Sequence, residues 1–189
     1  MKKPEKLNDP MQELLNKMDH DGAIDSLRAI DDSTREERVD RYLEVNRSIA
    51  IPITDFTKHF IDALKECINL YRDGHYIATV MLTQSVNEGL LKLVAERKSI
   101  EYKSKGYYYL LEIMMEQNIL PKECVNASKQ IYNSYRNDVH HMNLKVSEID
   151  FPALAKKNIH NLMVVENDIF YTDISEGKLI PKYPEFWFT

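Results

Sequence analysis

The residues best suited to chemistry lie together in one short segment, 136–141, which contains an arginine, an asparagine and two adjacent histidines. If this segment is helical, each residue advances by about 100° around the axis. Arg136 and His140 then share one row along the helix, and Asn137 and His141 share the adjacent row. Two neighbouring faces of one helix would therefore be polar together.

These residue types match the requirements for cleaving an RNA phosphodiester through its own 2′-hydroxyl. The reaction needs a base for the hydroxyl proton, an acid for the departing 5′-oxygen, and positive charge beside the phosphate. Histidine titrates near neutrality and can serve in either proton role. Arginine binds phosphate oxygens in a bidentate manner, and asparagine can orient either group. The segment therefore predicts RNA cleavage that requires no metal ion and no cofactor.

One copy of the segment provides a single histidine in each row, which is not enough for a complete acid–base pair. If two chains meet about a two-fold axis along this helix, the same residues appear twice across the interface. The cleft then contains both proton-transfer groups and two arginines. We therefore expect a homodimer.

The paired histidines allow other interpretations. His140 could be the catalyst, or a solvent-facing histidine near a helix C-terminus, where the helix dipole favours its charged form. A metal site formed by His140 and His141 is not expected, because adjacent helix residues point about 100° apart and no nearby acidic residue has a helpful spacing.

The apolar spacing around the segment predicts the helix that carries it. Pro121 stands where the first residue of a helix is favoured, and apolar residues recur at helical spacing as far as Met142. The segment would thus lie near the end of one helix. The apolar positions of that helix are Val125, Ile131, Tyr132, Tyr135, Val139 and Met142.

The remaining patterns predict an all-α, up-and-down bundle. Apolar spacing predicts helices over 54–73, 76–98 and 107–118. Pro152 begins a last helix that Gly177 closes, and an aromatic-rich tail over 178–189 is expected to fold back on the bundle. Because 76–98 is apolar on more than one face, we expect this helix at the centre of the bundle.

The N-terminal part predicts additional helices. One begins at Pro10, and a short helical segment spans 23–30. Ser33 with Glu36 forms a capping box for another helix, which Pro52 ends. We therefore divide the chain into an N-terminal helical extension, 1–52, and a helical bundle with its tail, 53–189.

Composition limits the class of protein. The chain has 189 residues, of which 43% are hydrophobic and 29% charged, with only five glycines, and this balance is typical of a helical domain with one core. The net charge of −5 argues against a surface that binds nucleic acid everywhere, so any RNA site must be local. Cys67 and Cys124 are expected to be reduced core residues. With no signal peptide or membrane-spanning run, we expect a cytoplasmic protein without a membrane partner.

The segment resembles a known motif. Arg136 and Asn137, followed by three residues and His141, resemble the Arg-x4-6-His motif, in its Arg-Asn-x-x-x-His form, of the HEPN family (higher eukaryotes and prokaryotes nucleotide-binding domains). The runs 71–78 and 84–92 are similar to the second helix of that family, and 118–121 is similar to the stretch before its motif helix.

The resemblance covers about residues 54–175, and it implies a bundle of four to five helices that dimerises with paired motifs in a cleft. It also implies a metal-independent endoribonuclease used in toxin–antitoxin or antiviral defence systems, with an antitoxin or defence protein as a possible partner. The alternative is a non-catalytic HEPN module that dimerises and binds a protein or nucleotide.

The resemblance also implies residue roles. Arg136 and His141 would be the catalytic pair, and Asn137 the positioning residue. Glu88 would be a possible supporting residue, because it occupies a polar position on the second helix that often faces the motif. His140 is the other possible supporting residue.

Two further features refine these expectations. The family's toxins that partner minimal nucleotidyltransferases often have a tyrosine two residues after the motif histidine. Asn143 occupies this position, so control by nucleotide addition to tyrosine is not expected. In the basic linker 97–106, lysines could bind RNA phosphates and an aromatic residue could stack on a base. The linker could equally be a solvated connection that binds no RNA. These weak candidates are Lys98, Tyr102, Lys103 and Lys105.

Overall fold

A computed structural model describes residues 20–46, 49–52, 54, 57–102 and 105–187. These residues are mostly helical, which confirms the all-α bundle. The chain divides into two compact units, Met1–Asp40 and Arg41–Thr189, whereas the sequence suggested a division after residue 52. The helix predicted to begin at Pro10 lies outside the described residues.

The first helix among the described residues, α2 (His20–Val45), is longer than predicted. The break expected before Ser33 is absent, because the Ser33 hydroxyl donates to the carbonyl of Ile30 within the helix instead of capping a new one. An ion pair between Arg35 and Asp32 also spans the expected break. The predicted end near Pro52 was wrong as well, since the helix ends at Val45.

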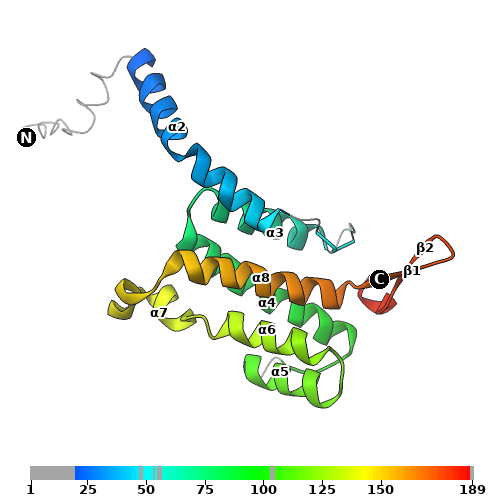
Figure 1. The fold of residues 1–189 in the computed structure, drawn as a ribbon. Helices are drawn as coiled ribbons and strands as arrows, with labels where there is room; N and C mark the ends of the chain where they lie inside the picture. The colour runs from blue at the N-terminus through cyan, green and yellow to red at the C-terminus, as the bar shows by residue number, and fades with distance from the viewer. Residues whose placement is uncertain (1–19, 47–48, 53, 55–56, 103–104, 188–189) are drawn as a thin grey trace, which may run out of the picture. The chain divides into compact units, whose positions relative to one another are not determined.

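The second unit is a helical bundle with α4 at its centre, as predicted (Figure 1). Helix α4 packs on α3 and α8, α6 packs on α8 and α4, and α5 packs on α6. The bounds are α3 (Lys58–Arg72), α4 (Tyr76–Arg97), α5 (Gly106–Glu116), α6 (Lys122–Tyr132) and α8 (Phe151–Ile169). Val80, Leu90 and Val94 of α4 are completely buried. Both cysteines are free and buried, which confirms their assignment to the core.

The predicted helix from Pro121 to Met142 is interrupted. Helix α6 ends at Tyr132, and the separate helix α7 (Arg136–His141) follows a bend in which Tyr135 has a left-handed backbone with φ of 53°. The reason lies in Ser134, whose carbonyl and hydroxyl oxygens both accept hydrogen bonds from Gln84 of α4. In a continuous helix, this carbonyl would accept a hydrogen bond from the backbone N–H group four residues later. Here it accepts from the side chain of Gln84 instead.

The C-terminal region also differs from its prediction. Helix α8 ends at Ile169, and Gly177 lies instead in the turn of a hairpin formed by β1 (Thr172–Ser175) and β2 (Lys178–Pro181). Glu176 and Gly177 both have positive φ, as two-residue hairpin turns require. The tail returns to the bundle at the short 3-10 helix η2 (Pro184–Phe186), because Phe186 is fully buried in the main core.

Helix α8 holds the segment that follows α2. Glu166 is completely buried, and its carboxylate accepts hydrogen bonds from the backbone N–H groups of Ala50 and Ile51. Ile51 is itself part of the main core. Within the described ranges, no helix combines the length and the apolar character needed to cross a bilayer.

The close approach of α3 and α4 at Gly89 gives a first prediction. A Cβ atom added at Gly89 would lie 2.7 Å from Cε1 of the buried Phe60 ring. We expect Gly89→Ala to lower the free energy of unfolding by about 1 kcal/mol, because overpacking outweighs the gain in helix propensity. Urea unfolding measures this change. Phe60→Leu combined with Gly89→Ala should show positive coupling, and a Gly89→Ala variant as stable as the wild type would contradict the contact.

Candidate active site

The segment singled out from the sequence forms α7, a short helix between two left-handed residues, Tyr135 and Met142. Its inner side is fixed by Val139, which is buried. Asn143, which follows the helix, donates from its side chain to the Asp138 carboxylate at 3.1 Å and from its backbone to the Asp138 carbonyl at 3.0 Å. The helix is therefore held at its inner face and at its C-terminal end.

Arg136 is held between α4 and α6. Its Nη2 lies 2.8 Å from Oε2 of Glu88, and its guanidinium lies over the ring of Tyr132, with Cζ 5.1 Å from the ring centroid. Nη1 is buried and has no hydrogen-bond partner. The structure thus brings together Glu88 and Arg136, the pair that the resemblance suggested.

Glu88 bridges two cations. Its Oε1 lies 2.6 Å from Nζ of Lys92, while Oε2 contacts Arg136. Burial raises the pKa of Glu88, but the hydrogen bond from Lys92 and the charge of Arg136 outweigh burial and leave this pKa below its ordinary value. With Glu88 ionised, the three side chains carry one net positive charge.

His140 and His141 have different environments. The His140 ring is exposed, yet its Nε2 lies 3.1 Å from Oε1 of Gln84, so it is tied to α4 and is not simply a solvent-facing residue. His141 and Asn137 are exposed, and neither has a hydrogen-bond partner among the residues described. The structure therefore leaves these two side chains available to a ligand, and neither of them is hydrogen-bonded to the side chain of Arg136.

A buried polar network supports the bend before α7. Gln84 donates to the carbonyl and hydroxyl oxygens of Ser134, both at 2.9 Å. Asn158 of α8 donates to the same hydroxyl at 2.9 Å and to the hydroxyl of Thr83 at 3.2 Å. Gln84, Thr83 and Asn158 are almost completely inaccessible to solvent. The network joins α4 and α8 to the chain immediately before Arg136.

A second polar cluster supports Tyr132, on which Arg136 rests. The ring of Tyr107 stacks on Tyr132 with centroids 4.0 Å apart. The Tyr107 hydroxyl accepts from Asn87 at 2.6 Å and lies 2.7 Å from the hydroxyl of Ser128. Burial raises the pKa of Tyr107, so its hydroxyl stays neutral. Arg136 is therefore positioned by side chains from three helices: Glu88 of α4, Tyr107 of α5 and Tyr132 of α6.

Sequence reasoning missed both networks, although a signal was present. Thr79, Thr83 and Asn87 recur every four residues within the otherwise apolar stretch of α4. This spacing places them in one row, and such a row inside a buried helix indicates polar partners on neighbouring helices. Lys92, four residues after Glu88, was also missed.

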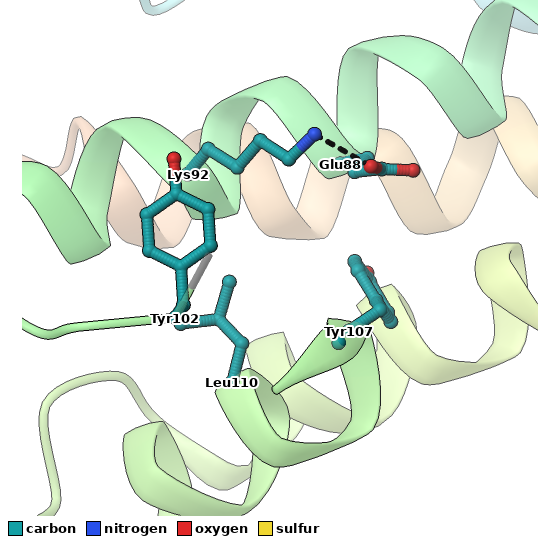
Figure 2. A pocket seen from close by; sticks show the side chains of 6 residues that line it. Glu88, Lys92, Tyr102, Tyr107 and Leu110 are labelled. Carbon is teal, nitrogen blue, oxygen red and sulfur yellow. Dashed lines mark ion pairs between the residues drawn. The ribbon is translucent and has the colours of Figure 1, made fainter. Parts of the chain in front are cut away.

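A cavity of about 360 Å³ opens beside Glu88. Figure 2 shows Glu88 and Lys92 of α4 on one side of it, and Tyr102, Leu110 and Tyr107 on the other. Gly106 completes the described lining. Among the weak RNA-binding candidates that the structure describes, Tyr102 lines this cavity.

Of the predicted linker lysines, the two that the structure describes, Lys98 and Lys105, do not line the cavity. Lys98 forms an ion pair with Glu185 and lies 5.7 Å from the ring centroid of Phe186, so it contacts the C-terminal tail. Lys105 lies over the ring of Tyr109. Lys103 lies outside the described residues. In the part of the chain that the structure describes, no three His, Cys, Asp or Glu side chains are grouped as metal ligands.

The network at the bend gives a second prediction. Asn158→Leu removes two buried hydrogen bonds and leaves Thr83 and Ser134 without these donors, so we expect unfolding free energy to fall by about 2 kcal/mol. Asn161→Leu is the matched control, because that residue is on the same helix and makes only a 3.4 Å hydrogen bond to Gln130. Chemical denaturation of both variants measures the difference. Equal losses would contradict the role of the network.

The charge of Glu88 gives a third prediction. The pKa of Glu88 is lower in the folded state than in the unfolded state. The carboxylate therefore stabilises the fold at pH values above the unfolded-state pKa, and this stabilisation is lost as the pH falls through the folded-state pKa. Glu88→Gln should therefore lower the stability at neutral pH by about 1 kcal/mol or less. Below the ordinary pKa of 4.5, this difference should shrink. Urea unfolding at both pH values, with the exposed Glu112→Gln as control, tests the expectation; a pH-independent difference would refute it.

Comparison with known proteins gave no family assignment. No protein-family model, no curated protein and no solved structure matches the chain. Its function must therefore be inferred from the residues of the site.

Proposed function

We propose that the protein is a metal-independent endoribonuclease of HEPN type that acts as a homodimer. The observation that carries this proposal is the arrangement of α7, where Arg136 is positioned by Glu88 and Tyr132 while His141 and Asn137 are exposed. Cleavage through the 2′-hydroxyl requires both an oriented cation and an accessible imidazole.

Arg136 binds the scissile phosphate in this proposal. Its side chain is 30% exposed and belongs to a cluster with one net positive charge. The buried Nη1 has no hydrogen-bond partner, and an unsatisfied donor is costly. A small movement of the guanidinium toward a phosphate would give Nη1 an acceptor while Nη2 keeps its contact with Glu88.

His141 transfers the protons. One histidine accepts the proton of the 2′-hydroxyl, whose oxygen attacks phosphorus, and the bond from phosphorus to the 5′-oxygen breaks. A second group protonates that oxygen, so the products are a 2′,3′-cyclic phosphate and a 5′-hydroxyl. Asn137 orients the RNA. In a homodimer, the second chain's copy of His141 supplies the acid.

The surroundings of α7 support an interface there. Tyr135, Met142 and Leu144 are 50%, 65% and 95% exposed, and all three flank the motif. Large apolar side chains grouped beside a functional segment often mark a contact with another chain. A homodimer that buries them would bring two motifs together.

The biological setting follows from the resemblance of the motif alone. We propose a cytoplasmic effector of a toxin–antitoxin or antiviral defence system, with an antitoxin or another defence protein as its partner. Such a partner would restrain cleavage until it is needed.

A specific observation favours a second candidate, a non-catalytic HEPN module. Arg136 is paired with Glu88, and His140 is hydrogen-bonded to Gln84. Both contacts fasten α7 to α4 without any substrate, as a structural role would require. Such a module would dimerise and bind a protein or nucleotide partner.

Cleavage of RNA in excess EDTA separates the two candidates. We expect the wild type to produce cyclic-phosphate ends, and His141→Ala to lose roughly 10²-fold or more in rate, because proton transfer contributes at least that factor. Arg136→Ala should lose cleavage through lost phosphate binding. The control is His160→Ala, an exposed histidine of α8 outside the motif.

End-group analysis of the products and sedimentation of each variant complete the experiment. A folded dimer with no cleavage of any tested RNA would favour the non-catalytic module. Cleavage that persists in His141→Ala would contradict the assigned proton-transfer residue.

A further inference from the structure

We propose that the cavity beside Glu88 is a base-recognition subsite that binds guanine, which makes guanine-containing single-stranded RNA the preferred substrate. This inference rests on the proposed nuclease function, and it assigns a role to Lys92 and Tyr102. The cavity of about 360 Å³ is large enough for a nucleobase, and it combines aromatic walls with a small number of polar groups.

The shape of the lining suits a flat aromatic ligand. Figure 2 shows Tyr102 and Tyr107 on either side of Leu110, opposite the charged side chains of α4. Proteins recognise unpaired RNA bases by stacking them on aromatic side chains and by bonding their Watson–Crick edges. Gly106, which also lines the cavity, has no side chain to restrict entry.

The polar groups favour guanine over the other bases. A carboxylate offers two acceptor positions on each oxygen. Lys92 occupies one position on Oε1 of Glu88, and Arg136 occupies one on Oε2, which leaves one position on each oxygen. Guanine alone presents two parallel donors, N1–H and N2–H, to such a pair. Its neighbouring O6 is an acceptor for the ammonium group of Lys92.

The same carboxylate places the base beside the cleaved bond. Glu88 contacts Lys92 in the cavity wall through one oxygen and Arg136 through the other. A base bonded to Glu88 and a phosphate bonded to Arg136 would therefore be held close to the same carboxylate. This arrangement suits a guanine nucleotide directly next to the scissile phosphate.

Binding of the four nucleoside 5′-monophosphates, measured by titration calorimetry, tests the subsite without requiring cleavage. We expect guanosine monophosphate to bind about tenfold more tightly than the others, as one bidentate contact confers. Lys92→Gln should weaken this binding severalfold, and Tyr102→Ala should remove the stacking contribution. The matched controls are Lys65→Gln and Tyr171→Ala, exposed residues outside the cavity.

If Tyr102→Ala does not fold, Lys92→Gln still tests the subsite. The Lys92 side chain is 45% exposed, so its replacement should not prevent folding. Equal affinity for all four nucleotides, no binding at millimolar concentration, or an unaffected Lys92→Gln variant would overturn the subsite. Sequencing of cleavage products separates this failure from that of the nuclease. Cleavage at bonds that have no neighbouring guanine would support the nuclease and exclude the guanine subsite. Guanine-selective binding without cleavage would support the subsite and exclude the nuclease.

Discussion

The position of α7 depends on one buried side chain, Gln84 of α4. Its amide nitrogen binds the carbonyl and hydroxyl oxygens of Ser134, and its amide oxygen lies within hydrogen-bond distance of His140. A buried amide must satisfy both of its ends, because an unpaired polar group away from water is costly. The bend at residues 133–135 satisfies this requirement, and it turns α7 away from the course of α6.

The same helix supplies the electrostatics of the site. Glu88 lies one turn after Gln84 and joins Arg136 to Lys92. An arginine close to a single carboxylate would be neutralised, but the additional lysine leaves the group positive. Helix α4 therefore both places the motif and sets its charge, and its central location in the bundle makes it the rigid element on which the site is built.

The fold was largely accessible from the sequence because burial follows periodicity. The spacing of apolar residues gave α4 and the main helices of the bundle, and it identified Cys67 and Cys124 as core residues. The sequence does not predict the hairpin, because a glycine such as Gly177 suits a helix end and a two-residue turn equally well. At Ser33, a capping pattern occurs inside a continuous helix, since local side-chain signals are weak compared with intrahelical hydrogen bonds.

The sequence by itself determined which residue types occupy the candidate site and that a helix carries them. It could not determine the interruption before Arg136, because the competing hydrogen bonds come from Gln84, far away along the chain. It could not bring Lys92, Tyr102 and Tyr107 to one cavity either, since they belong to different segments. Periodicity records which face of a helix is buried, whereas contacts between helices depend on how buried polar groups find partners, and only the tertiary structure decides that pairing.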